Sequence, residues 1–458
     1  MMFNPLLAYF LTNQHLNLTK CTYIGEAFYI MIFLYEYRGT ISNMKKSLFT
    51  VILFTMIFSL SACNEPMKAK EPATIHLLLP KPNGYDSGGY LRDDLFKKAV
   101  PAFQKINPLI TVVIDYITGE ENYETDPLDV IPYNTLLINE VQKEEIFLDL
   151  KPLQQKADNK ELDINKNILD LATSNGKLLI IPSSANPLVI LYNKDLYKKA
   201  GIPFPQGNWT WEQFREVSKK IKDNHGSVIP YDPYIMELLM SSTGKSLISP
   251  DADTSIGYLD SPEAIRSIQW LNDYYKDDES KTVPLNFTDA YIRFSTEQVA
   301  MILGSIDSYT LLKQKIGDKI GAAPLPYFEG GMRANPISFD GYGISKNSKH
   351  PEESWAFIQY LTLTNHENAI SFSNFNITTS ASVAKGIHQD TDPIKSVIAD
   401  ELNYAVLPSG FRSPLYSNPK INNQFQELFN LDDKELPEKL HELALSADEE
   451  LKRVVKGD

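Results

Sequence analysis

The sequence predicts an α/β protein built as two lobes or domains. Its 458 residues are too many for one compact core, because most single domains have about 100–150 residues. Short β-branched or leucine-rich runs alternate with amphipathic segments, which is typical of a sheet covered by helices. After residue 62 the apolar residues are patterned rather than continuous, so we expect no membrane-spanning helix there.

Residues 44–63 read MKKSLFTVILFTMIFSLSAC, the pattern of a bacterial lipoprotein signal peptide. Two lysines precede an apolar run that is long enough for a secretion signal and shorter than the roughly 20 residues that span a bilayer. The last four residues resemble a lipobox, in which the cysteine thiol is acylated and the chain is cut before it. We therefore expect 44–62 to be a signal peptide and 63–73 to be lipidated Cys63 and a tether. A buried core segment is the alternative, but the polar NEPMKAKEP that follows argues against it.

Residues 1–43 have no evident role before such a signal. We interpret them as a mis-annotated upstream extension, with translation starting at Met44. The codons of Arg38 and Gly39 can spell a purine-rich ribosome-binding sequence at a suitable distance. The alternative is a genuine N-terminal extension.

Composition excludes several classes of protein. The two cysteines are Cys21, upstream of the signal, and Cys63, so the folded part has no disulfide or cysteine metal site. The net charge of −14 opposes binding to nucleic acid and to anionic lipid headgroups. The histidines lack the spacing of a metal motif, and we expect no metal and no cofactor.

Strands and helices alternate from residue 74. TIHLLLP (74–80) is a buried-strand pattern, 93–106 is an amphipathic helix containing a proline, and PLITVVIDYI and PLDVIPYN are two further strands. This series indicates a largely parallel sheet. Ligands of such sheets bind beyond the carboxyl ends of strands, here at the loop 81–90 and at Tyr133-Asn134.

The stretch 177–214 is rich in local signals. A strand ends at Pro182, a short polar crossing follows, and a new strand begins at Leu188. Gly201 ends a helical turn, and Thr210 with Gln213 forms a capping box for the next helix. Trp211, Phe214 and Ile221 form the buried stripe of that helix.

These segments resemble a known family. The strand, the crossing, LYNKDLYKKAGIP and TWEQF are similar to the solute-binding proteins of bacterial ABC importers, specifically the carbohydrate-type family 1 that includes maltose-binding protein. FSTEQVAMILGSIDSY and GAAPLPYFEGGMRANPISFDGYGISKNSKHPEESWAFIQYLT match later family blocks in the same order. The resemblance covers residues 74–455.

The resemblance implies a type II periplasmic-binding-protein fold, with two α/β lobes closing on a ligand cleft. Three crossing segments are expected near 184–187, 338–341 and 376–381. The N-lobe would comprise 74–185 and 340–378, and the C-lobe 187–338 and 380–458.

The main alternative hypothesis to exclude is that the protein is an enzyme. No H-E-x-x-H zinc motif and no G-x-S-x-G nucleophile elbow occurs. TGKS lacks the earlier glycine of a phosphate loop, and DAD lacks the other ligands of a calcium loop. Paired carboxylates for glycoside hydrolysis stay open, because nothing selects a pair among the acids. We expect no catalysis.

Candidate ligand-binding residues come from loops expected to face the cleft. Sugars need aromatic faces and polar side chains around their hydroxyls. All four tryptophans have scaffold positions, and Ile306 stands where the family often has a cleft tryptophan. A tyrosine or phenylalanine would therefore supply the stacking face, and Tyr231 is one candidate. The candidates are Asn83, Asp86, Tyr133, Asn134, Tyr231, Asp232, Tyr234, Ser305, Asp307, Asp340, Tyr342 and Arg412.

The expected function is that of a monomeric receptor, anchored to the bacterial cell membrane by lipid on Cys63. It would deliver a small solute, a mono- or oligosaccharide, to the transmembrane subunits of an ABC permease. The alternatives are a lipid-anchored extracytoplasmic hydrolase and a ligand receptor for a sensor kinase.

Overall fold

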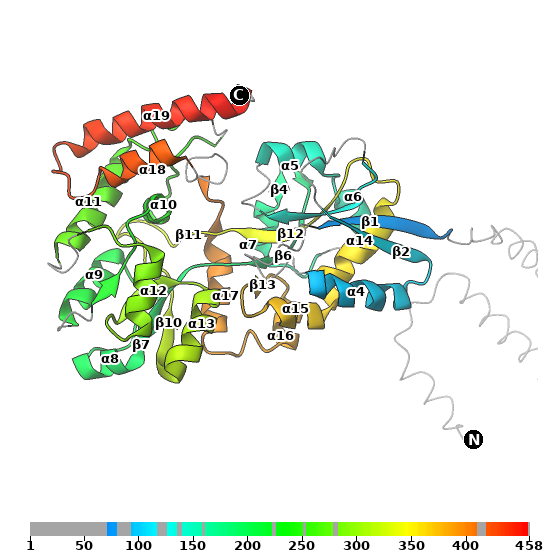
Figure 1. The fold of residues 1–458 in the computed structure, drawn as a ribbon, viewed down its shortest axis with the longest axis horizontal. Coiled ribbons are helices and arrows are strands. Elements are labelled where there is room, and N and C mark those ends of the chain that lie inside the picture. The colour runs from blue at the N-terminus through cyan, green and yellow to red at the C-terminus, as the bar shows by residue number, and fades with distance from the viewer. Residues whose placement is uncertain are drawn as a thin grey trace, which may run out of the picture. The chain divides into compact units, whose positions relative to one another are not determined.

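The structure is a computed structural model that describes residues 71–79, 93–116, 126–134, 140–157, 161–221, 226–250, 253–277, 283–409 and 418–456 (Figure 1). The residues from Pro72 onward form one compact unit. Within the described ranges no helix is long and apolar enough to cross a membrane. The predicted signal peptide, Cys63, Asn83, Asp86 and Arg412 lie outside the described residues.

The first sheet has six strands in the order β13-β6-β12-β3-β1-β2. Their bounds are β1 Ala73–Leu79, β2 Ile110–Tyr116, β3 Val130–Asn134, β6 Ile181–Ala185, β12 Phe339–Ile344 and β13 Ile377–Thr378. Strand β1 is parallel to β2 and β3, but β12 is antiparallel to β3 and β6, and β13 is antiparallel to β6. The parallel arrangement expected from the first three strands is confirmed for β1, β2 and β3, but the sheet as a whole is mixed. The antiparallel pairs all involve β12 or β13, the last two of the six strands along the chain.

The second sheet has four strands in the order β10-β7-β9-β8. These are β7 Val189–Asn193, β8 Ser227–Val228, β9 Met301–Gly304 and β10 Ile320–Ala323. Only residues 186–188 separate β6 of the first sheet from β7 of the second. Two short ladders complete the described strands, β4 Thr173–Ser174 with β5 Lys177–Leu178, and β11 Asn335–Pro336 with β14 Ala405–Val406.

One group of helices packs around the first sheet. It comprises α4 Asp93–Ile106, α5 Glu140–Ile146, α6 Lys151–Lys156, α7 Lys166–Leu171, α14 Pro351–Gln359, the π-helical turn η2 Tyr360–Thr364, α15 His366–Phe372 and α16 Ala381–Gly386. Helix α4 contacts β2, α14 contacts β1 and β12, and α16 contacts β13. Phe103 and Phe357, 4.9 Å apart between ring centroids, join α4 to α14 in this core.

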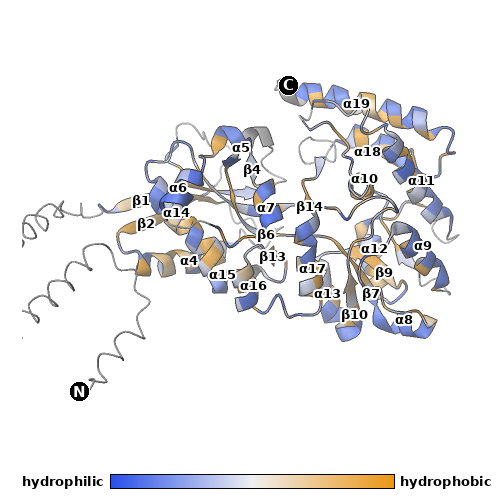
Figure 2. Cartoon of the chain, turned by 180° about the vertical axis from the view of Figure 1, so that it is seen from behind, coloured by the Kyte–Doolittle hydropathy of each residue, from blue (hydrophilic) through white to orange (hydrophobic). Residues whose placement is uncertain are grey.

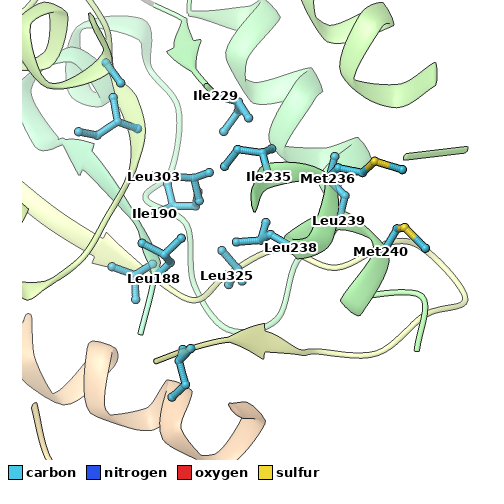
Figure 3. Close-up of a cluster of buried hydrophobic side chains, with 14 of the residues drawn as sticks. Leu188, Ile190, Ile229, Ile235, Met236, Leu238, Leu239, Met240, Leu303 and Leu325 are labelled. Atoms are coloured by element: carbon cyan, nitrogen blue, oxygen red, sulfur yellow. The ribbon is translucent and has the colours of Figure 1, made fainter. Parts of the chain in front are cut away.

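The other helices surround or follow the second sheet. They are α8 Lys194–Ala200, α9 Trp211–Lys220, α10 Pro233–Ser241, α11 Pro262–Lys276, α12 Phe287–Ser295, α13 Ile306–Ile316, η1 Gly317–Lys319, α17 Lys395–Asp400, η3 Glu401–Tyr404, α18 Pro419–Gln426 and α19 Leu436–Lys456. Figure 3 shows how Ile235 and Leu238 of α10 lie close to Ile190 of β7 and Leu303 of β9, forming an apolar cluster.

The local signals around α8 and α9 are confirmed. Gly201 ends α8 in the left-handed region at φ 68°, a conformation that glycine adopts without steric cost. Thr210 and Gln213 form the reciprocal capping box of α9. Trp211 is fully buried, with its ring centroid 5.2 Å from that of Trp270.

Replacing Trp211 by alanine should destabilise the fold. The substitution leaves a cavity among Phe214 and Trp270, and such cavities cost about 3–5 kcal/mol. The melting temperature should fall by many degrees in a calorimetric scan. Leu445→Ala, at a position 45% exposed on α19, is the control and should leave the melting temperature almost unchanged. A Trp211→Ala chain that melts like the parent would contradict this scaffold role.

Candidate functional site

Four polar side chains meet where the first sheet approaches the crossing segments. Asn134 ends β3, Ser184 lies near the end of β6, Asp340 is the second residue of β12, and Asn376 immediately precedes β13. Asp340 pairs with Asn134 on one side and with Ser184 on the other. Residues 186–188 leave the sheet at this same edge. We call these four residues the Asp340 cluster.

The carboxylate of Asp340 is the centre of the cluster. Its Oδ1 accepts a short hydrogen bond from Nδ2 of Asn134. Its Oδ2 accepts hydrogen bonds from Oγ of Ser184 at 3.4 Å and from Nδ2 of Asn376 at 3.3 Å. Asp340 is only 5% exposed, and a buried carboxylate is tolerated where several donors satisfy it. Since a carboxylate only accepts, it also fixes which way the Asn134 amide points.

The second sheet presents polar residues at the edge next to the same crossing. The end of β9, at Gly304, pairs with Val189 at the start of β7, so Ser305 and Asp307 follow β9 close to residues 186–188. Oγ of Ser305 donates a hydrogen bond to the carboxylate of Asp307. The amide of Ser308 donates to the same carboxylate at 2.7 Å. The pair is thus held at the start of α13.

Asp232 and Tyr234 link α10 to the second crossing. Asp232 caps the helix, accepting a hydrogen bond from the Tyr234 amide at 2.8 Å, and burial raises the pKa of its carboxyl group. The hydroxyl of Tyr234 donates to the carbonyl of Pro336 at 2.5 Å. Pro336 belongs to β11, a few residues before β12, so Tyr234 connects α10 with the chain that crosses between the sheets. Burial also raises the pKa of Tyr234.

Tyr231 is a core residue, which corrects one expectation from the sequence. Its side chain is 3% exposed and its ring contacts those of Tyr275, Phe425 and Phe429. Its hydroxyl donates to Oδ1 of Asn272 at 3.2 Å. The ring therefore offers no open face for stacking on a sugar. The sequence misled here because an aromatic residue after a strand can serve the core as well as a cleft.

Tyr133 and Tyr342 are also buried, in the first sheet. The Tyr133 ring packs against Phe147 and Phe339, and it is 1% exposed. Tyr342 is 4% exposed, has an edge-to-face contact with Phe96, and has a pKa raised by burial and by nearby Asp340. Both support the Asp340 cluster from within the core.

Asn186, in the first crossing, was not among the candidates from the sequence. Its backbone nitrogen donates to the carbonyl of Ser338 at 3.3 Å, which joins the first and second crossings. Its side-chain Oδ1 is buried and has no hydrogen-bond partner among the described residues. A buried acceptor without a donor costs about 1–3 kcal/mol, so a donor supplied at this point would be favourable. Ser184 and Asn376 were missed as well, although both lie in expected crossing segments.

A buried ion pair holds the chain beside the crossings. The Arg333 guanidinium lies 2.7 Å from the Glu401 carboxylate, with side-chain exposures of 7% and 1%. Burial raises the pKa of Glu401, while Arg333 and hydrogen bonds from Asn335 and Leu325 oppose that rise. Nδ2 of Asn335 also donates to the carbonyl of Leu188 at 2.6 Å, so the pair is tied directly to the first crossing.

The arrangement offers hydrogen-bonding groups to a polar ligand. The described groups at the two sheet edges are carboxylates, amides and hydroxyls, which can pair with ligand hydroxyls in both directions. Within the described ranges, no group of three or more His, Cys, Asp or Glu could hold a metal ion.

Comparison with known proteins identifies the family. The sequence model of the bacterial extracellular solute-binding proteins matches residues 90–364. This match covers more than half of the chain, and the chain belongs to that family. The resemblance seen in the sequence is thereby confirmed.

The relatives are distant. The arabinooligosaccharide-binding protein of Bacillus subtilis is 26% identical over 227 residues, which are 46% of this chain and 50% of that protein. A probable ABC transporter-binding protein of Deinococcus radiodurans is 23% identical over 281 residues, 56% of this chain and 64% of that protein. The matched part thus spans about half to two thirds of these curated relatives.

Solved structures share the fold. A cyclo/maltodextrin-binding protein complexed with maltotetraose has a TM-score of 0.65 at 17% identity, covering 84% of this chain and 98% of that one. The sugar-binding protein MalE of Xanthomonas citri has a TM-score of 0.65 at 18% identity, covering 83% and 98%. The expected fold class, an α/β periplasmic-binding-protein fold of type II, is confirmed.

Removing the Asp340 carboxylate should destabilise the first sheet. Asp340→Ala leaves the donors of Asn134, Ser184 and Asn376 without their acceptor, at a cost of at least about 1–3 kcal/mol. Asp340→Asn keeps one acceptor oxygen and should lose less. The free energy of unfolding in urea measures both.

Glu352→Ala is the matched control for that experiment. Its carboxylate pairs with Lys156 on the surface, where such a pair contributes about 0–1 kcal/mol. If Asp340→Ala were no less stable than Glu352→Ala, the Asp340 cluster would not hold the sheet edge together.

Proposed function

We propose that this protein is the substrate-binding component of an ABC import system, and that it works outside the cytoplasm. It captures a small solute between two lobes and delivers it to the permease without catalysis. One observation carries the proposal. Polar side chains collect at those edges of two separate sheets that adjoin the crossing segments, in a chain of the solute-binding family.

The solute we propose is a mono- or oligosaccharide. Amide, carboxylate and hydroxyl groups such as those of Asn134, Asp307 and Tyr234 suit a ligand covered with hydroxyl groups. The names of the relatives, which include an arabinooligosaccharide-binding protein, support the same class. The four tryptophans are buried, at 0–7% exposure, so the affinity would rest mainly on hydrogen bonds rather than on tryptophan stacking.

Lobe closure is the proposed mechanism. Residues 74–185 with 340–378 would form the N-lobe, and 187–338 with 380–458 the C-lobe. The strand membership of the two sheets supports this division, whereas the contacts of α16 with α15 and β13 favour extending the N-lobe past residue 380. Closure would select the ligand-bound arrangement and present one surface from both lobes to the permease.

The proposed anchor is lipid on Cys63, after removal of residues 44–62 and with Met44 as the start. A diacylglyceryl group provides two acyl chains, and two are needed for stable attachment. The protein would act as a monomer held to the membrane.

A sugar should raise the melting temperature of the protein. A ligand at a hundred times its dissociation constant stabilises the folded state by about 2.7 kcal/mol. A thermal-shift screen should therefore pick out members of a panel of mono- and oligosaccharides. Stabilisation by amino acids, peptides or polyamines alone would contradict the sugar assignment.

Asn186→Ala should weaken solute binding by about tenfold, because it removes one hydrogen bond of about 1.4 kcal/mol. The unliganded variant should be as stable as the parent or slightly more stable, since it loses a buried acceptor without a donor. Calorimetric titration and urea unfolding measure the two effects. Unchanged affinity would remove Asn186 from the binding site.

Cys63→Ala should abolish lipidation. The variant would not incorporate a labelled fatty acid and would migrate as the longer, uncleaved precursor in gel electrophoresis. Ser61→Thr keeps the thiol and should still be labelled. A labelled, normally cleaved alanine variant would overturn the anchor.

A further inference from the structure

Helix α4 and the turn after it expose apolar and basic side chains on one face. Lys98, Ala102, Lys105, Ile106 and Leu109 are all exposed, at the spacing of three or four that brings residues onto one side of a helix. Ile106 is 66% exposed and Leu109 is 44% exposed. We call this surface the α4 face. Figure 2 shows hydrophobic colour where α4 ends beside β2.

The α4 face differs in charge from the rest of the protein. The chain has 58 acidic and 44 basic residues. Residues 95–114 contain lysines at 97, 98 and 105 and no acid, although Asp93 and Asp94 begin α4 and Asp115 follows in β2. An apolar face bordered by lysines is the pattern of segments that lie on membrane surfaces.

The chain enters the folded unit beside this face. The amide of Ala73, the first residue of β1, donates to the carbonyl of Leu109 at 2.8 Å. Ala73 lies ten residues after Cys63, which carries the proposed lipid. Ten extended residues span at most about 36 Å. A lipid on Cys63 would therefore keep Leu109 within about that reach of the bilayer.

We propose that the α4 face rests on the membrane that carries the lipid anchor. The occupant is a bilayer surface containing anionic headgroups. Ile106 and Leu109 enter the boundary between headgroups and acyl chains, and Lys98 and Lys105 lie near lipid phosphates. This inference depends on the proposed lipidation of Cys63. The α4 face is small, so its own affinity for a membrane is low. The short tether compensates by giving the face a high effective concentration at the bilayer.

Contact between the α4 face and the membrane would fix the orientation of the protein relative to the bilayer. Helix α19 lies at the other end of the ribbon from α4 in both views (Figures 1 and 2). While the protein is not docked to the permease, the second sheet would then lie farther from the bilayer than the first sheet.

Single cysteine labels test the orientation. The sequence has no cysteine after Cys63, so Leu109→Cys and Leu445→Cys each give one labelling site, at 44% and 45% exposure. The lipidated chain is reconstituted in vesicles of phosphatidylcholine with phosphatidylglycerol and labelled with a fluorophore. Spin-labelled lipids should quench the label at 109 severalfold more strongly than the label at 445.

Two further arms separate the possible failures. Adding Lys105→Glu and Ile106→Glu should reduce quenching at 109 to the level at 445, and pure phosphatidylcholine should weaken it. Equal quenching at both sites, while the protein still sediments with the vesicles, would overturn the orientation and leave the anchor intact. Loss of sedimentation would refute the anchor and this proposal with it. Protection of the label at 109 only after permease subunits are added would mean that the face is a protein interface and not a membrane contact.

Discussion

The buried carboxylate of Asp340 is the interaction on which the arrangement of the first sheet edge depends. It joins the ends of β3 and β6 to the chain that enters β13, and it does so at the point where the backbone leaves for the second sheet. A charge at 5% exposure is stable only while its donors stay in place. The polar side chains at this sheet edge are therefore held together by their hydrogen bonds to the Asp340 carboxylate.

A second fixed point lies on the other side of the crossings. The Arg333–Glu401 pair and Asn335 hold residues 400–406 to Leu188 and to Leu325. The same stretch meets α7 of the first group, where Nδ2 of Asn167 donates to the carbonyls of Leu402 and Ala405 and Ile168 lies in the same buried apolar cluster as both residues. The buried ionic contacts are harder to exchange than these partly exposed hydrogen bonds.

The sequence predicted the local structure well, because local signals decide it. The capping box at Thr210, the glycine stop at Gly201 and the strands before and after the first crossing depend on neighbours within a few residues. It did not predict the partners of Asp340, which are 36 to 206 positions away in the chain. For the same reason it placed Tyr231 in a cleft, because only tertiary packing brings Phe425 and Phe429 onto its ring. The sequence also did not predict that β12 pairs antiparallel with β3 and β6, because that pairing depends on the path of the whole chain.

The strand order of the first sheet also governs when the protein can fold. Strand β12 lies between β6 and β3, yet it comes from residues 339–344, long after both neighbours. The early strands thus have a gap at the centre of their sheet until most of the chain has been made, and such distant pairings form slowly. A polypeptide exported through a signal peptide must remain unfolded during transit. In a chain exported as proposed above, the late central strand would delay completion of the sheet.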